Sequence, residues 1–295
     1  MELTAYGILY LVATPIGNLG DLSFRAVDIL SQVALIACED TRHSRPLLLH
    51  HGISTPLWAL HEHNEDHAAA TLVERLLKGE SIALISDAGT PLINDPGYPL
   101  VQAAIKKGIR VVPVPGACAL IAALSASGLP THRFSFEGFP PRKSAARKAT
   151  LKTLLDYQGT LVFYESSHRV MAFIQDIAMV FPANRTLVIA RELTKRFETL
   201  ARTCVADGVG LLEQDPDMQR GEFVILLEGA PERSHQEQLD VDVQRMLALL
   251  LEECPLRTAV SLTVKISGAK KDDVYREALK LKTEADGGQG VETGG

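Results

Sequence analysis

The chain has 295 residues, of which 46% are hydrophobic and 22% are charged, a composition typical of globular proteins long enough for two domains. Its net charge of −6 does not by itself indicate a nucleic-acid partner. No apolar run is long enough to span a bilayer, and the first residues lack the basic segment of a secretory signal. Four scattered cysteines without a CxxC pair favour a reducing cytoplasm, and we expect no metal site, even at His61, His63 and His67.

Residues 1–116 predict a parallel α/β domain, because apolar strands alternate with helices about every 30 residues. The expected strands are 7–14, 33–38, 57–60, 82–86 and 110–114. The expected helices are 22–31, 68–78 and 100–107, with Asp21 as a plausible N-cap of the first. The polar EDTRHS segment is expected to be a loop.

Residues 117–232 predict a second α/β domain with antiparallel character, because its strands come closer together. A helix of small residues is expected at 117–127 and another helix at 149–157, after a basic loop, PPRKSAARK. The expected strands are 134–139, 160–164, 186–190, 199–205 and 222–227.

Residues 230–238 predict a polar linker, and 240–282 a small helical domain. Two of its helices, joined by Ser267-Gly268, resemble a helix-turn-helix, and residues 257–282 carry 7 basic and 3 acidic groups. A plain helical hairpin that packs as a dimer arm is the alternative. The tail 283–295 is expected to be disordered.

One stretch, SIALISDAGTPLINDPGYP at 81–99, predicts a ligand site, since a buried strand there ends in a polar loop rich in Gly and Pro. The alternative is a structural turn. A dinucleotide is disfavoured, because GNLGD at 17–21 lacks the third glycine of the usual fingerprint.

Eight ordered motifs closely resemble those of the small-subunit rRNA ribose 2′-O-methyltransferase branch (the I type) of the tetrapyrrole methylase superfamily. The resemblance spans roughly residues 6–282. The motifs are LVATPIGNLGDLSFRAVDIL, CEDTRHSRPLL, HEHNE, ISDAGTPLINDPGYPL, PVPGACALIAALSASGLP, FYESSHRV, ARELTK and GEFVILLEG. One departure is Ser167, where the family usually has proline.

The resemblance implies two α/β domains with S-adenosylmethionine between them, a homodimer, and methylation of a cytidine ribose in the decoding centre of 16S rRNA in the 30S subunit. The implied cofactor contacts are Pro15, Asp87, Ala88, Gly89, Thr90, Pro91, Ala117, Cys118 and Ala119. Small residues at 117–119 leave room for an adenine ring.

Methyl transfer to a weakly acidic 2′-hydroxyl benefits from a base. The leading candidates are Glu39, His63, Glu65 and Glu165, with Asp40 and His168 beside them. Each has a structural alternative: Glu39 could pair with Arg42, His63 could donate at a strand end, and Glu165 could pair with Arg169.

Basic residues flank these motifs and predict phosphate contacts. The expected RNA-binding residues are Arg142, Lys143, Arg147, Lys148, Arg191 and Lys195. The alternative for the 142–148 cluster is a solvated loop. Phe139, Phe163 and Tyr164 could stack an unpaired base, although core packing is favoured for Phe163. Two other functions stay open at this point: a porphyrinoid C-methylase, and a non-catalytic RNA-binding or ribosome-assembly factor.

Overall fold

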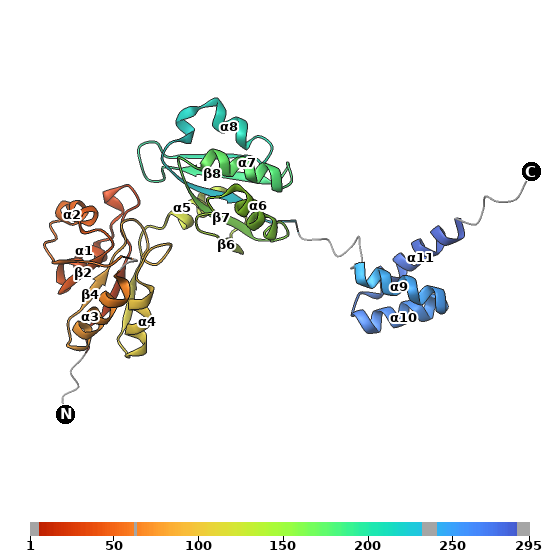
Figure 1. The fold of residues 1–295 in the computed structure, drawn as a ribbon, viewed down its shortest axis with the longest axis horizontal. Helices are drawn as coiled ribbons and strands as arrows, with labels where there is room; N and C mark the ends of the chain where they lie inside the picture. The colour runs from red at the N-terminus through yellow and green to blue at the C-terminus, as the bar shows by residue number, and fades with distance from the viewer. Residues whose placement is uncertain (1–5, 62–63, 232–240, 288–295) are drawn as a thin grey trace, which may run out of the picture. The chain divides into compact units, whose positions relative to one another are not determined.

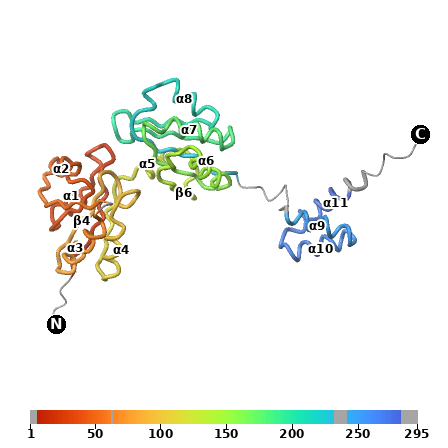
Figure 2. Tube along the Cα trace, viewed as in Figure 1, coloured from red at the N-terminus to blue at the C-terminus, as the bar shows by residue number. Residues whose placement is uncertain are grey.

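A computed structural model of the chain describes residues 6–61, 64–231 and 241–287 (Figure 1). The chain divides into two compact units, Met1–Ala230 and Pro231–Gly295, and each is described by itself. The first unit contains two separate five-stranded sheets, and the second contains three helices. Figure 2 follows the backbone from the red and orange first sheet to the green second sheet. The expected α/β architecture with a helical C-terminal part is confirmed.

The first sheet is entirely parallel, with the strand order β3-β2-β4-β1-β5. Each strand lies within an apolar segment that the sequence predicts to be a strand. The strands are β1 (Leu9–Val12), β2 (Leu35–Cys38), β3 (Leu57–Ala59), β4 (Ile82–Leu84) and β5 (Val111–Val114). Because parallel strands have their carboxyl ends at one edge, the loops that follow β1, β2 and β4 come together there.

Helices cover both faces of this sheet (Figure 1). They are α1 (Phe24–Gln32), α2 (Thr41–His50), α3 (Glu65–Leu77) and α4 (Tyr98–Lys106), with a short 3-10 helix at Leu19–Asp21. Leu35 and Leu84 pack in the core that contains the apolar residues of α3 and α4. Ile36 and Ile85 pack in the core formed with α1 and α2. Successive strand residues therefore alternate between two buried cores, which explains the nearly continuous apolar runs.

The second sheet has the order β6-β7-β10-β8-β9. Only β6 and β7 pair in parallel, and the other neighbours are antiparallel, as the close spacing of the strands predicts. The strands are β6 (Phe134–Phe136), β7 (Thr160–Ser166), β8 (Thr186–Arg191), β9 (Thr199–Cys204) and β10 (Glu222–Leu227).

Two cores lie on opposite faces of this sheet. One contains Phe163 and Phe223 and is covered by α6 (Ser144–Thr153), α7 (Val170–Val180) and α8 (Gly208–Gln214). The other contains Val162 and Val224 and is covered by α5 (Ala119–Ser127). A second 3-10 helix, Pro216–Gln219, precedes β10. The two faces of β7 therefore contact different cores, and successive side chains of the FYESSHR motif point to opposite sides of the sheet.

The C-terminal unit consists of α9 (Val241–Glu253), α10 (Leu256–Ser267) and α11 (Lys271–Gly287). Leu247, Val260 and Val274 are fully or almost fully buried in its core. Gly268 ends α10 in the left-handed conformation (φ 70°), as a glycine after a helix commonly does. The expected turn at Ser267-Gly268 is confirmed. None of the helices in the described ranges is both long and apolar enough to cross a membrane.

Four local expectations are wrong. The first helix is capped by the Ser23 hydroxyl, which accepts from Ala26 N at 3.1 Å, while Asp21 lies in the preceding 3-10 helix. The EDTRHS segment forms the start of α2 rather than a loop, because Asp40 caps it. The basic loop is also largely helical, since α6 begins at Ser144 and ends at Thr153. Part of the tail expected to be disordered belongs to α11, which reaches Gly287, and 288–295 lie outside the described residues.

Candidate functional site

Two loops that are far apart in sequence join at the carboxyl edge of the first sheet. Thr14 N donates to Gly89 O at 2.9 Å, and Gly89 N donates to Thr14 O at 3.0 Å. The Thr14 hydroxyl also donates to Ser86 O at 3.1 Å. Gly89 has φ 83°, a conformation that disfavours residues with a side chain, and a Cβ there would meet Ile16 Cγ2 at 3.3 Å. The loops after β1 and β4 therefore form one continuous wall.

The start of the second domain joins the same wall. The Thr90 hydroxyl donates to Ala117 O at 3.0 Å. The structure thus brings together three segments that contain all nine expected cofactor contacts. Six of these residues line a single cavity: Asp87, Ala88, Gly89, Thr90, Cys118 and Ala119. Pro15, Pro91 and Ala117 are their immediate neighbours in the chain, and the cofactor role of all nine stays a prediction.

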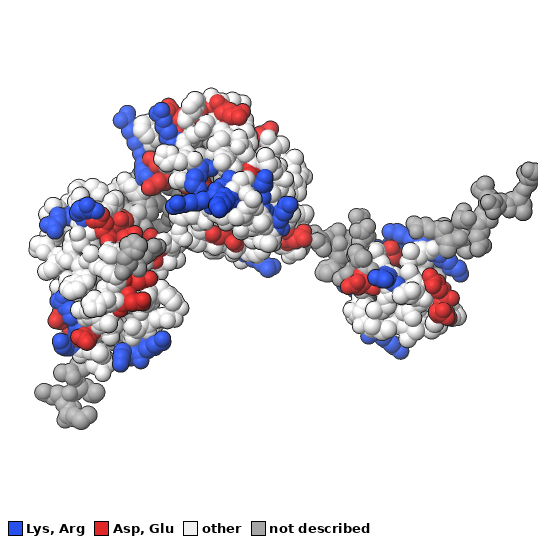
Figure 3. Space-filling view, in the orientation of Figure 1, with Lys and Arg blue, Asp and Glu red and all other residues white. Residues whose placement is uncertain are grey.

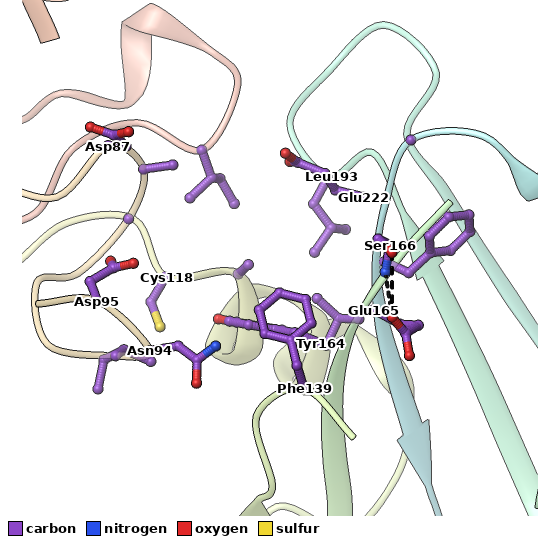
Figure 4. Close-up of a pocket in the computed structure, with 18 of the residues that line it drawn as sticks. Asp87, Asn94, Asp95, Cys118, Phe139, Tyr164, Glu165, Ser166, Leu193 and Glu222 are labelled. Carbon is purple, nitrogen blue, oxygen red and sulfur yellow. Dashed lines mark hydrogen bonds between the residues drawn. The ribbon is translucent and has the colours of Figure 1, made fainter. Parts of the chain in front are cut away.

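The cavity has a volume of about 460 Å³, within the range of small-molecule sites. Its opposite wall comes from the second sheet and from the loops around β6, β7, β8 and β10 (Figure 4). Sequence reasoning assigned no cofactor or catalytic role to several lining residues: Ile16, Ile93, Asn94, Asp95, Leu193 and the segment 221–224. The sequence marks most of these residues, because Asn94 and Asp95 belong to NDPG, Leu193 to ARELTK and 221–224 to GEFV, which are parts of the family motifs.

The CEDTR motif contacts the wall that is formed by the loops after β1 and β4. Asp40 N donates to Asp87 Oδ1 at 3.2 Å, and Asp40 Oδ1 accepts from Arg42 N at 2.8 Å at the start of α2. The Arg42 guanidinium and backbone lower the pKa of Asp40 to about 2. Arg42 therefore pairs with Asp40. Glu39 is half-buried, and its charge acts on Asp95 in the cavity.

The HEHNE motif supports a second loop of the cavity. Glu65 Oε2 accepts from Gly97 N at 3.1 Å, just before α4. Asn64 is held in turn, because its amide donates to Ala59 O at 3.1 Å and its carbonyl accepts from His61 N at 2.8 Å. Glu65 thus has a positioning partner, and its expected role as a base stays a prediction. His63 lies outside the described residues.

The FYESSHR motif projects its side chains to both faces of the second sheet. Val224 pairs with Tyr164 and Phe223 with Glu165, so Tyr164 lies on the cavity face and Glu165 on the face of the opposite core. Figure 4 shows the two side chains diverging. The Glu165 side chain is fully buried and contacts Arg169 at 3.2 Å, and burial raises its pKa. The expected Glu165–Arg169 pair is confirmed, although Glu165 is in a strand, and the expected role of Glu165 as the base stays a prediction.

Arg147 is buried and has a structural role, while its expected contact with RNA stays a prediction. Its guanidinium pairs with Asp176 of α7 at 2.6 Å, and both side chains are almost completely buried. It also donates to the carbonyls of Pro141 and Arg142 at 3.3 and 3.2 Å. Arg169 donates to Pro140 O of the same loop. Two arginines therefore fix the backbone of residues 140–142.

Of the other expected RNA-binding residues, Arg142 and Lys143 are exposed on this fixed loop and Lys148 is half-exposed. Arg191 is buried, and its Nε donates to Arg220 O at 2.7 Å, so it has a structural partner and its expected RNA contact stays a prediction. Lys195 pairs with Glu192 at 3.0 Å and with Glu222 at 2.8 Å. Figure 3 shows basic side chains gathered on the second domain and acidic ones on the facing part of the first.

The aromatic residues beside this loop separate into two groups. Phe163 is buried and packs against Phe173 with their ring centroids 5.2 Å apart, which confirms its core role. Phe139 is 51% exposed and lies at the cavity with its ring 5.8 Å from Tyr164. Phe139 is therefore accessible to a ligand and Phe163 is not.

No group of three or more His, Cys, Asp or Glu side chains that could hold a metal ion occurs within residues 6–61, 64–231 and 241–287. This statement does not extend to His63, which lies between the first two ranges.

Comparison with known proteins matches residues 8–207 to the family model of tetrapyrrole (corrin/porphyrin) methylases. The chain belongs to this family. Residues 237–282 match a second model, described as the RsmI C-terminal HTH domain. This second match favours the helix-turn-helix interpretation of the C-terminal helices over a plain hairpin.

Curated relatives resemble almost the whole chain. The proteins named ribosomal RNA small subunit methyltransferase I from Escherichia coli O157:H7 and Pseudomonas aeruginosa are 49% and 50% identical to it over 274 residues. These alignments cover 93% of this chain and 95% and 97% of the two relatives. The family expected from the eight motifs is confirmed.

Solved structures share the fold at low sequence identity. Uroporphyrin-III-C-methyltransferase from Thermus thermophilus has a TM-score of 0.53 and 23% identity, covering 75% of this chain and 94% of its own. Diphthine synthase has a TM-score of 0.57 and 13% identity, covering 76% and 90%. These similarities establish the fold alone.

The buried Arg147–Asp176 pair yields a stability prediction. Arg147→Ala leaves Asp176 buried without its partner and is expected to cost about 3–5 kcal/mol of the free energy of unfolding. Arg142→Ala, on the exposed surface, should stay within about 0.5 kcal/mol. Urea unfolding measures both. Equal stability of the two variants would contradict the structural role of Arg147.

Proposed function

We propose that the protein transfers a methyl group from S-adenosylmethionine to the 2′-oxygen of a cytidine ribose in the decoding centre of 16S rRNA. The observation that supports this most is the near-full-length similarity, at about half of all positions, to proteins named ribosomal RNA small subunit methyltransferase I. The cytidine and the 2′-oxygen come from the motif resemblance.

The cavity fits the proposed methyl donor. Asp87 and Thr90 offer polar groups on one wall, while Ile16, Ile93 and Leu193 provide apolar surface for a flat ring. Gly89 lets the backbone approach closely, since its left-handed conformation needs no side chain. The bound sulfonium would supply a methyl group as an electrophile. The residues that we propose to hold it are those of the wall formed by 15–16, 87–91 and 117–119.

The acceptor side of the site is proposed to be the second-domain loop 139–143. Phe139 is exposed enough to stack an unpaired base, and Arg142 and Lys143 are available for phosphates. Arg147 and Arg169 donate to the backbone carbonyls of residues 140–142, so the exposed groups of this loop keep a defined geometry. We propose the assembled 30S subunit as substrate, a cytoplasmic location and a homodimer, as the motif resemblance implies.

One labelling experiment tests the reaction. The protein is incubated with methyl-labelled S-adenosylmethionine and, separately, 30S subunits lacking the modification, naked 16S rRNA, or a porphyrinoid. Label in a cytidine ribose of either RNA sample supports the proposal, and label confined to 30S subunits identifies the assembled particle as substrate. Label in the porphyrinoid alone favours C-methylation, and no label in any sample favours a non-catalytic RNA-binding factor.

Asp87 yields a binding prediction. Asp87→Ala removes a charged acceptor from the cavity and the partner of Asp40 N, so affinity for S-adenosylmethionine should fall by roughly 10-fold to 100-fold, the usual value of a charge-assisted hydrogen bond. Isothermal titration calorimetry measures this affinity. Asp28→Ala, on the exposed surface of α1, is the matched control. Unchanged affinity in the Asp87 variant would contradict the proposed contact between Asp87 and S-adenosylmethionine.

The exposed basic loop yields an RNA-binding prediction. The double variant Arg142→Ala/Lys143→Ala should bind 16S rRNA more weakly, and the slope of log affinity against log salt should become less steep by about 1.5 because two phosphate contacts are lost. Lys106→Ala/Lys107→Ala, at the exposed end of α4, is the charge-matched control. If both double variants keep the wild-type slope, the loop does not contact phosphate.

A further inference from the structure

Six of the described residues that line the cavity have ionisable side chains, which can exchange a proton. They are Asp87, Asp95, Cys118, Tyr164, Glu165 and Glu222. A general base has to reach the acceptor hydroxyl and be unprotonated near neutral pH. The surroundings of each side chain decide between them.

Four of these side chains are engaged elsewhere or hold their proton. Glu165 projects to the opposite face of the sheet and contacts Arg169. Glu222 is 79% exposed and pairs with Lys195. Asp87 Oδ1 accepts from Asp40 N. Burial raises the pKa of Tyr164 well above its usual value, and its oxygen accepts from Leu120 N.

Asp95 and Cys118 remain, and of these two only Asp95 carries a carboxylate. Figure 4 shows its carboxylate inside the cavity, next to Cys118 and Asn94 and on the same wall as Asp87. Burial, together with the charges of Glu39 and Asp87, raises its pKa to about 6, against the opposing hydrogen bond from the Ser86 hydroxyl. The other ionisable groups that face it are Cys118 and Tyr164. The carboxylate is therefore more basic than an ordinary aspartate and is still mostly ionised at neutral pH.

The loop that carries Asp95 is fixed on both sides. Leu92 and Asn94 have φ values of 72° and 73°, a conformation that non-glycine residues seldom adopt. On one side, Glu65 accepts from Gly97 N at 3.1 Å. On the other, Asn94 Oδ1 lies so close to Gly138 that a Cβ there would approach it to 2.9 Å. The chain on either side of Asp95 is thus held by Glu65 at Gly97 and lies close to Gly138 at Asn94.

We propose that Asp95 takes the proton from the acceptor hydroxyl, an assignment that rests on the proposed function. The hydroxyl oxygen forms the new O–C bond and passes its proton to an Asp95 carboxylate oxygen. The electron pair of the broken C–S bond stays on sulfur, which becomes a neutral thioether. Protonated Asp95 then releases its proton to water. Glu39 and Asp87 keep the carboxylate basic enough for this transfer.

The test is Asp95→Asn, which keeps the shape and removes the base. With 30S subunits, kcat should fall by roughly 100-fold to 10,000-fold while calorimetry shows unchanged affinity for S-adenosylmethionine. The wild-type rate should rise through a midpoint near 6, the raised pKa of Asp95, and Asp95→Asn should lack this step. Asp28→Asn, on the exposed surface of α1, is the matched control and should behave as wild type.

A second readout uses the protein without its methyl donor. Since folding raises the pKa of Asp95, the wild type loses stability as pH rises through about 6, and Asp95→Asn does not. The melting temperature of the variant should therefore exceed that of the wild type at about pH 8, and the difference should shrink near pH 4.5. A difference that is independent of pH would overturn the assignment.

Glu39→Gln distinguishes Asp95 from its charged neighbour. Removing the Glu39 charge should lower the pH at which the methylation rate reaches half of its maximum, because one cause of the raised Asp95 pKa is gone. If Glu39→Gln abolishes the rise of the rate with pH and Asp95→Asn keeps it, Glu39 is the base and the proposal fails. It also fails if Asp95→Asn keeps full kcat or loses cofactor affinity. A wild type that labels no RNA would refute the proposed function instead.

Discussion

The mutual hydrogen bonds of Thr14 and Gly89 join the loops that follow the first and fourth strands, and the candidate site depends on this contact. Loops at the edge of a parallel sheet expose backbone donors and acceptors that need partners once a cavity closes over them. Here the neighbouring loops provide those partners. The CEDTR motif contacts Asp87, the HEHNE motif contacts Gly97, and the FYESSHR motif contacts Pro140.

These contacts give the polar motifs a role that differs from the one their composition suggests. Acids and histidines in a cleft favour an interpretation as bases, but Glu65 and Glu165 each hold another group in position. Asp95 differs from them because its carboxylate faces the cavity. The supporting carboxylates Asp40 and Glu65 follow β2 and β3, and Glu165 lies in β7, whereas Asp95 belongs to the loop after β4.

The sequence predicts the fold well, because buried parallel strands leave continuous apolar runs and the turns are marked by Gly and Pro. The motif resemblance also groups 15, 87–91 and 117–119, and hydrogen bonds join these three segments, while their cofactor role stays a prediction. The sequence could not predict the burial of Arg147, because its partner Asp176 lies 29 residues away in a helix that no local pattern connects to it. Nor could it tell that Tyr164 and Glu165 face opposite cores, which only the pairing with β10 decides.

The strand order has a consequence for synthesis. β1 lies between β4 and β5, so the first sheet stays open until Val111–Val114 has emerged from the ribosome. Ala117, the partner of the Thr90 hydroxyl, follows within three residues. The sheet and the wall that joins Thr14, Gly89, Thr90 and Ala117 can therefore be completed together, before any strand of the second sheet has been made. Domains generally fold in the order in which they are synthesised, so this wall of the cavity can exist while the opposite wall is still being translated.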